Sequence, residues 1–466
     1  MKRDLCGRLD EWRSSTRRKP LIVKGARQVG KTFLLQTWGR ETFPKAHYIN
    51  FEKNTAAARS FDRDFDVKRI LNELSFHLDA TIDPDSDLLI FDEIQACPKA
   101  MTALKYFCED QPQLAVACAG SLLGVILTPE PFPVGKVQFL HLHPMSFPEF
   151  LGAVDTRGSL DHLPPPSVSA ATSLKVGAGL HEHLWDMLRL YYVTGGMPES
   201  VGILAEARDH RTPRLRAILQ EVRATQRSLI GSYEKDFAKH AGKVNATHIH
   251  ALYHNIPSQL ASVQDESTRR FQFGDVLPGK KGFAVWERPV QWLKNAGLAH
   301  KIKIANHAGL PLEHFTKPNM FKLIPHDIGL LGCMLDLPPA VLLDQQFGMA
   351  KGYFAEVYVA QSMVASVPAD KDQQLYCWQE GESEIEFLVT GERGPIPVEV
   401  KSGVRTKARS LGQYISRYKP ELAIRLSAKP LAWDPDRRLL NLPLPLAHWI
   451  ETWATSMDPG LTSQTK

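Results

Sequence analysis

The chain has 466 residues, a hydrophobic content of 43% and a formal net charge of +5. This length allows two or three domains, and the hydrophobic content supports proper cores. The small charge excess does not by itself indicate a nucleic-acid-binding protein, so any basic surface would have to be local.

Three features of the sequence predict a soluble, cytoplasmic protein without a membrane partner. The six cysteines are scattered and form no C-x-x-C motif, which indicates a reducing cytosol and no structural zinc. The start of the chain lacks the apolar core of a signal peptide. The longest apolar run, residues 114–127, is too short to span a bilayer and is broken by Gly and Ser.

The first motif is Gly25-Ala26-Arg27-Gln28-Val29-Gly30-Lys31-Thr32, which fits the pattern G-x-x-x-x-G-K-[ST] of a loop that wraps nucleotide phosphates. Apolar residues 21–23 predict a buried strand before it, and the residues from Phe33 onward predict a helix after it. Backbone N–H groups of residues 25–33 would face the phosphates. Lys31 would reach the β- and γ-phosphates, and Thr32 would hold Mg²⁺.

A second motif consists of apolar residues 88–91 followed by Asp92 and Glu93, which indicates a buried strand with two carboxylates at its tip. Ligands of open α/β sheets bind at such tips. Asp92 is the expected partner of Mg²⁺, and Glu93 is placed to orient the attacking water, which favours hydrolysis. A third strand, residues 114–119, leads to Ser121, a candidate sensor of the γ-phosphate that could equally be a helix N-cap.

The composition changes after this region. Residues 156–180, rich in Pro, Ser, Ala and Gly, predict a linker or mobile loop between a P-loop domain of residues 1–155 and a helical region of residues 181–255. His248 and His250 lie near His254 in a helical stretch. Metal binding is conceivable there, but no acid stands at helical spacing from these histidines.

Residues 256–335 predict a winged-helix-like region. Residues 290–298 form an expected helix ended by Gly297, and the alternating strand 299–304 has residues 321–324 as its expected partner. Lys294, His300, Lys301 and Lys303 could touch nucleic-acid phosphates there. A module of this kind can also serve only to pack one domain against another.

Residues 336–455 predict an α/β domain, followed by a tail of residues 456–466. An expected helix carries Glu356, one expected strand carries Glu386, and Glu399 and Lys401 point to one face of the next strand. Two carboxylates and a lysine that converge in this way suit a second Mg²⁺ site and phosphodiester cleavage. Solvated charges or an inactive relic are the alternatives.

Taken together, these motifs make the chain resemble the bacterial and archaeal AAA+-like P-loop ATPases of AAA_14/DUF4143 architecture. The resemblance covers nearly the whole chain and rests on residues 18–21, 25–32, 91–95, 144–147, 195–198, 232–237, 256–260 and 397–403. It implies binding and hydrolysis of ATP with Mg²⁺, a winged-helix middle and a restriction-endonuclease-like C-terminal domain.

Two residues depart from the family pattern. Lys136 stands where relatives often carry an arginine, and a lysine cannot supply the bidentate fork of an arginine finger. Glu386 stands where relatives usually carry Asp, and the extra methylene displaces a carboxylate for which Mg²⁺ demands near-ideal octahedral geometry.

Three functions are compatible with this sequence. The first is an ATP-driven switch or remodeller that acts on the middle and C-terminal modules. The second is an ATP-regulated nuclease or DNA-binding effector, as in genome defence, with DNA or RNA as partner. The third is a non-catalytic scaffold that binds a protein or a nucleic acid and carries a vestigial nuclease fold. The sequence leaves open whether the chain forms oligomers.

Overall fold

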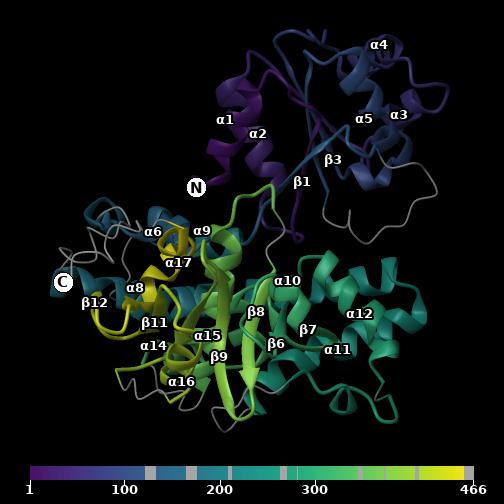
Figure 1. Cartoon of the computed structure of the whole chain (residues 1–466). Helices are drawn as coiled ribbons and strands as arrows, with labels where there is room; N and C mark the ends of the chain where they lie inside the picture. Colours follow the sequence, from purple (N-terminus) through teal and green to yellow (C-terminus); the bar gives the residue numbers. More distant parts are fainter. Residues whose placement is uncertain are drawn as a thin grey trace.

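The computed structural model describes residues 1–120, 133–163, 176–207, 213–262, 270–280, 282–344, 350–371, 374–404 and 409–455. Two β-sheets organise these residues. Figure 1 shows the first sheet with helices α1–α5 as an upper lobe, above a larger body that holds the second sheet and the remaining helices. The expected α/β class, with helices between the two sheet regions, is confirmed.

The upper lobe contains a parallel sheet with the strand order β2-β3-β4-β1-β5. Its elements are α1 (Leu5–Ser14), β1 (Leu21–Lys24), α2 (Lys31–Thr42), β2 (Ala46–Asn50), α3 (Thr55–Ala58), η1 (Arg59–Phe61), α4 (Val67–Leu78), β3 (Leu88–Asp92), η2 (Ile94–Ala96), α5 (Pro98–Asp110), β4 (Ala115–Ala119) and β5 (Gln138–His141).

Both faces of this sheet are covered, which explains the apolar runs of its central strands β1, β3 and β4. Leu21 and Val23 of β1 belong to one hydrophobic core, whereas Ile22 between them belongs to another. Strands β3 and β4 alternate in the same way. The core that contains Leu21 continues into the larger body, so the upper lobe and the body share packed apolar side chains.

The middle of the chain is mostly helical. Its elements are α6 (Phe147–Val154), η3 (Ser159–His162), α8 (Ala178–Thr194), α9 (Pro198–Glu206), α10 (Pro213–His240), α11 (Lys243–Ser262), η4 (Phe273–Asp275), α12 (Phe283–Asn295), β6 (Ala299–Ala305), η5 (Leu312–Phe315), β7 (Thr316–Pro325), α13 (Ile328–Met334) and α14 (Pro339–Leu343). The expected stop at Gly297 is confirmed, because α12 ends at Asn295 and Gly297 adopts a φ of 73°.

The C-terminal region supplies the remaining strands. Its elements are α15 (Ala350–Ser366), β8 (Leu375–Glu380), β9 (Ser383–Thr390), β10 (Pro395–Val400), α16 (Arg409–Tyr418), β11 (Ala423–Ser427), β12 (Ala432–Asp434), β13 (Leu439–Pro443), η6 (Leu444–Trp449) and α17 (Ile450–Thr455). The expected order of helix, three strands, helix and strand is therefore present in α15, β8–β10, α16 and β11.

The second sheet is mixed and joins the middle to the C-terminal region. Its strand order is β12-β13-β11-β10-β9-β8-β6-β7. The two strands expected to form a wing, β6 and β7, pair antiparallel with each other, and β6 also pairs in parallel with β8. The expected domain limit between residues 335 and 336 thus separates segments that share one sheet, and the winged-helix assignment stays a prediction.

A buried carboxylate connects three distant segments beneath the upper lobe. Asp327 accepts hydrogen bonds from the Gly196 N–H at 2.6 Å and from the Gln361 amide at 3.2 Å. The Gly196 carbonyl in turn accepts from the Met145 N–H at 2.6 Å. A Cβ at Gly195 would lie 2.1 Å from Asp327 Oδ1, so only glycine fits there. The motifs at residues 144–147 and 195–198 therefore contact each other and, through Asp327, the helix α15.

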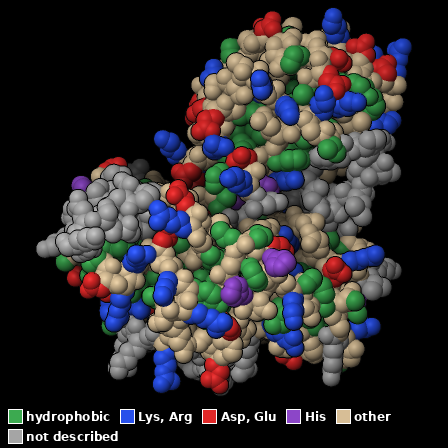
Figure 2. All heavy atoms as spheres, in the orientation of Figure 1, with side chains coloured by type: hydrophobic (Ala, Val, Ile, Leu, Met, Phe, Trp, Pro, Cys, Tyr) green, Lys and Arg blue, Asp and Glu red, His purple; other side chains and the backbone are tan. Residues whose placement is uncertain are grey.

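Neither the surface charge on one face nor the helices indicate a special environment for the described residues. On the face drawn in Figure 2, basic and acidic side chains are interspersed, so this face presents no field of a single sign. Within the described part of the chain, no helix is both long enough and apolar enough to cross a membrane.

Candidate nucleotide site

The loop of residues 25–30 connects β1 to α2 at the carboxyl edge of the upper sheet. Gly25, Gln28 and Gly30 all have positive φ values, of 151°, 65° and 94°. A Cβ at Gly25 would lie 2.1 Å from the Leu142 carbonyl oxygen, so the loop needs glycine there. A loop of this kind that leads into a helix N-terminus can offer backbone N–H groups to a phosphate, as the motif predicts.

Lys31, the first residue of α2, lies buried inside this loop. Its ammonium donates hydrogen bonds to the Gly25 carbonyl at 2.9 Å and to the Ala26 carbonyl at 2.8 Å. Burial lowers the pKa of Lys31 to about 8. A desolvated ammonium next to converging N–H groups is a strong site for an anion, because the phosphate charge replaces the solvation that burial removes.

Asp92 and Thr32 meet next to this lysine. The Thr32 hydroxyl lies 3.0 and 3.1 Å from the two Asp92 oxygens. Asp92 also accepts from the Tyr48 hydroxyl at 2.6 Å and from the Asn50 amide at 3.1 Å. A hydroxyl and a carboxylate are the hard oxygen ligands that Mg²⁺ prefers, so Thr32 and Asp92 fit the predicted metal position.

Tyr48 and Asn50 were not predicted from the sequence. They stand two residues apart on β2, and Asn50 is in register with Asp92 of β3. The signal was present in the alternation of the expected strand, which places both side chains on one face and next to the acidic tip. Burial and the hydrogen bond to Asp92 raise the pKa of Tyr48 to about 12, so its hydroxyl keeps its proton and acts as a donor.

Glu93, the predicted catalytic carboxylate, follows Asp92 directly. It adopts a left-handed φ of 48°, and its side chain accepts from the Gln95 amide. Burial raises the pKa of Glu93, and the charge of Asp92 adds to this effect. A carboxylate with a raised pKa is a better proton acceptor, as a general base for water requires. Ser121, the predicted sensor, lies outside the described residues.

The phosphate loop is in contact with elements far away in the sequence. Arg27 pairs with Asp236 of α10 at 2.6 Å, and its carbonyl accepts from the Tyr233 hydroxyl at 3.2 Å. The guanidinium of Arg3 donates to the Val29 carbonyl at 2.9 Å. A Cβ at Gly297, just after α12, would lie 3.1 Å from the Ala26 nitrogen. Sequence reasoning identified the motif of residues 232–237 but not its contact with this loop.

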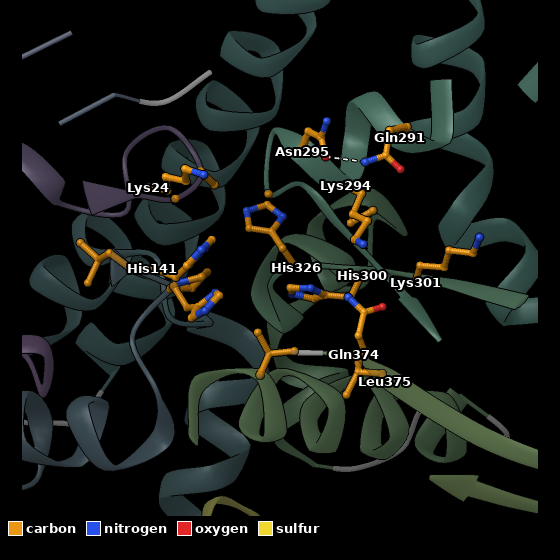
Figure 3. A pocket seen from close by; sticks show the side chains of 18 of the residues that line it. Lys24, His141, Gln291, Lys294, Asn295, His300, Lys301, His326, Gln374 and Leu375 are labelled. Carbon is orange, nitrogen blue, oxygen red and sulfur yellow. Dashed lines mark hydrogen bonds between the residues drawn. The ribbon is translucent and has the colours of Figure 1, made fainter. Parts of the chain in front are cut away.

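A pocket of about 260 Å³ extends from the loop into the body. Figure 3 shows Lys24 and His141 on one side, Lys294 and His300 on the other, and His326 between them. No Asp or Glu occurs among the described residues that line this pocket. Of the residues expected to touch nucleic-acid phosphates, Lys294, His300 and Lys301 line it, whereas Lys303 pairs with Glu313 at 2.6 Å.

Of the histidines that line the pocket, His326 is buried and His300 is partly buried. Burial lowers the pKa of His300 to about 3 and that of His326 to about 4, so both rings are neutral at pH 7. His326 Nδ1 hydrogen bonds with the Leu298 carbonyl, and its Nε2 is buried without a hydrogen-bond partner in the described structure. These two rings therefore add no positive charge to the pocket, whereas Lys24, Lys294 and Lys301 do.

The charged residues predicted to form a second Mg²⁺ site in the C-terminal region lie near one another, but each carboxylate already has a cationic neighbour. Lys401 lies 3.7 Å from Glu386 and 3.8 Å from Glu399. Arg425 pairs with Glu399 at 2.8 Å. Glu356, the fourth predicted residue, pairs with Lys322 of β7 at 2.6 Å.

Lys322 and Arg425 were not predicted at this cluster. Lys322 also lies 3.3 Å from Glu384, and burial raises the pKa of Glu384 to about 8. Burial likewise raises the pKa of Glu386 to about 7. Among the described residues, Glu356, Glu386 and Glu399 do not bring their oxygens within 4.8 Å of one another. The second Mg²⁺ site therefore stays a prediction.

The phosphate loop, the buried lysine and the acidic strand tip on a parallel sheet define a P-loop ATPase. Three family models match successive segments: the AAA domain AAA_14 at residues 17–151, the domain of unknown function DUF8612 at residues 186–340, and the domain of unknown function DUF4143 at residues 351–445. These matches support a P-loop ATPase of AAA_14/DUF4143 architecture, as expected, and such a fold implies binding of a nucleotide and usually of Mg²⁺.

Several solved structures are similar to the chain. A Walker-type ATPase of Pyrococcus abyssi has 16% identity and a TM-score of 0.40, over 72% of this chain and 95% of that chain. The Aeropyrum pernix ORC1 protein in complex with DNA has 13% identity and a TM-score of 0.28, over 73% and 92%. A RuvB variant of Thermotoga maritima has 12% identity and a TM-score of 0.33, over 69% and 91%. No curated protein matches the chain.

Proposed function

We propose that the chain is a Mg²⁺-dependent ATPase that works as a nucleotide-driven switch on its middle and C-terminal regions. The observation that carries this proposal is the contact between the phosphate loop and α10. Arg27 belongs to the loop that would hold the phosphates, and both its guanidinium and its carbonyl are held by residues of α10. A change in the loop therefore acts directly on the body.

The chemistry of the site suggests how ATP would be used. Lys31 and the loop N–H groups bind the phosphates, and Thr32 and Asp92 would hold Mg²⁺, which neutralises charge on the β- and γ-phosphates. Glu93 orients the attacking water and accepts its proton. Tyr48 and Asn50 donate to Asp92 and fix the direction of its oxygens.

The switch follows from a competition for Lys31. Without nucleotide, the ammonium bonds with the Gly25 and Ala26 carbonyls. A phosphate competes for the same ammonium, so these two peptide units lose their donor when nucleotide binds. Ala26 abuts Gly297 and is followed by Arg27, so an adjustment of the loop is passed to the end of α12 and to α10.

The experiment measures ATP turnover of the full chain and the hydrogen exchange of α10 with and without ATP. The Lys31→Ala variant should lose tight ATP binding, and retention of full affinity would refute the assignment of the loop. The Asp236→Asn variant should still hydrolyse ATP but lose the ATP-dependent change in exchange along α10. An unchanged response in Asp236→Asn would show that the Arg27 contact does not transmit the nucleotide state.

A second candidate function is an ATP-regulated protein that binds or cleaves nucleic acid. It is favoured by the acid-free pocket beside the loop, which Lys24, Lys294 and Lys301 line. ATP turnover measured with double-stranded DNA, single-stranded DNA or RNA tests binding. Mg²⁺-dependent cleavage that is lost in Glu399→Ala would support a nuclease. Absence of cleavage on varied substrates would instead favour the scaffold with a vestigial fold.

A further inference from the structure

Three potential metal ligands meet on the outer surface of the helical hairpin formed by α10 and α11. His250 and His254 stand one turn apart on α11, and their ring centroids are 4.5 Å apart. Glu234 of α10 places its Oε1 2.7 Å from His254 Nε2 and 4.0 Å from His250 Nε2. Two ring nitrogens and one carboxylate oxygen from two helices thus converge on one point.

The spacing of these atoms fits a tetrahedral metal. Zn²⁺ bonds of about 2.0–2.1 Å place neighbouring ligand atoms about 3.3 Å apart. The two distances to Glu234 Oε1, 2.7 and 4.0 Å, lie on either side of this value. The side chains of His250, His254 and Glu234 are 55%, 40% and 34% exposed, so small rotations can equalise the distances without disturbing the core.

The cluster also stands apart from the other acidic and histidine groups of the molecule. In the portion of the chain that the structure describes, it is the sole group of three His, Cys, Asp or Glu residues whose ligand atoms all lie within 4.8 Å of one another. The sequence showed the neighbouring histidines but not the acid, because Glu234 comes from a different helix than the histidine pair. The expectation of no structural zinc rested on cysteine spacing alone, which does not bear on these residues.

We propose that Glu234, His250 and His254 form a Zn²⁺ site that ties α10 to α11. Two imidazoles and one carboxylate are a donor set that Zn²⁺ accepts, and three protein ligands leave the fourth position to water. The hydrogen bond between Glu234 and His254 shows that the two helices already place these groups against each other. The metal would take the place of the proton in this hydrogen bond. This inference does not depend on the proposed ATPase activity.

The test is a calorimetric titration with Zn²⁺ of the full chain, after treatment with a chelator and in the absence of nucleotide. Wild type should bind one equivalent tightly. His250→Ala and His254→Ala should each weaken this binding about 10- to 100-fold or more, because loss of even an outer-shell partner costs that much. Co²⁺ in place of Zn²⁺ should give a visible absorption band in wild type that both variants lose.

His248→Ala is the matched control, because His248 lies on the same helix but packs 5.2 Å from Trp286 instead of facing Glu234. It should bind Zn²⁺ as wild type does. Equal binding by wild type, His250→Ala and His254→Ala would place the metal elsewhere, for example on cysteines, and overturn the proposal. Absence of binding in wild type, or the same loss in His248→Ala, would overturn it as well.

A thermal measurement gives an independent readout. A ligand that binds only the folded chain raises the melting temperature by mass action. Zn²⁺ should therefore raise the melting temperature of wild type and of His248→Ala, but not that of the His250→Ala, His254→Ala double variant. A shift of equal size in the double variant would refute the site even if calorimetry detected bound metal.

Discussion

Replacement of Lys31 by Met should stabilise the nucleotide-free protein while it abolishes ATP binding. Burial lowers the pKa of this ammonium from its ordinary 10.5 to about 8. This difference in pKa corresponds to about 3 kcal/mol, which is the cost of burying the charged ammonium in the folded chain relative to the unfolded chain. Methionine fills a similar volume without a charge, so the variant avoids this cost.

Part of the gain is offset by the loop. The Gly25 and Ala26 carbonyls lose the donor that now lies 2.9 and 2.8 Å away, at a cost of about 1 kcal/mol each if nothing replaces it. We therefore expect Lys31→Met to raise the free energy of unfolding at pH 7 by about 1–2 kcal/mol. Affinity for ATP should fall at the same time, because the ammonium that reaches the phosphates is gone.

The pH dependence gives the stricter test. Folded Lys31 loses its proton near pH 8, whereas the unfolded chain keeps it until about pH 10.5. Between these values the unfolded state binds more protons, so this residue makes the free energy of unfolding rise with pH. The advantage of Lys31→Met over wild type should therefore be largest below pH 8 and shrink as the pH approaches 10.5.

Urea denaturation of both proteins at several pH values between 7 and 10 measures this difference. The control is Lys136→Met at a half-exposed lysine paired with Glu109, which should show no comparable gain at pH 7. A Lys31→Met variant that is less stable than wild type at pH 7, or a difference that does not vary with pH, would refute the assignment of a costly buried charge.

Two further changes test the site and the fold. Glu93→Gln should bind ATP with wild-type affinity but hydrolyse it at least about 100-fold more slowly, because the amide cannot accept the proton of water. Single-turnover assays measure the rate of hydrolysis. Unchanged turnover would remove Glu93 from the mechanism. Gly196→Ala should cost about 3 kcal/mol or more, since its Cβ would lie 2.1 Å from the Met145 carbonyl oxygen. Gly231 lies in open space on α10, so Gly231→Ala should instead raise the free energy of unfolding by about 0.5–1 kcal/mol. Denaturant titrations that rank the two variants in the opposite order would contradict the described packing.

The local parts of the nucleotide site could be predicted from the sequence because each is encoded by contiguous residues. The loop motif fixes Lys31 and Thr32, and an apolar run with an acidic end fixes Asp92 and Glu93. Strands β1, β3 and β4 carry apolar runs because both faces of the sheet are covered, which made them recognisable. The expected helix stop at Gly297 also needed only local information.

The partners of these residues could not be predicted in the same way. The contact of Arg27 with Asp236 joins residues 209 positions apart, and no local pattern selects one acid of a long helix over another. Lys322 could not be predicted at the C-terminal cluster for the same reason. It lies on β7 and contacts Glu356 only because the strand order of the second sheet does not follow the chain. The pairing of β6 with β8 likewise depends on the tertiary arrangement.

One turn of α10 carries both the contacts to the phosphate loop and the acid of the inferred metal site. Tyr233 and Asp236 contact Arg27, and Glu234 between them faces α11. Zn²⁺ that holds Glu234 against α11 also restricts this turn, so we expect ATP and Zn²⁺ to change each other's dissociation constants. Linkage requires the same factor in both directions.

Asp236→Asn should bring that factor close to one, because it weakens the contact with the loop while it leaves all three metal ligands in place. Calorimetric titration of each ligand with and without the other measures both factors. A coupling that survives in Asp236→Asn would show that the influence passes by another path, such as the contact of Ala26 with Gly297.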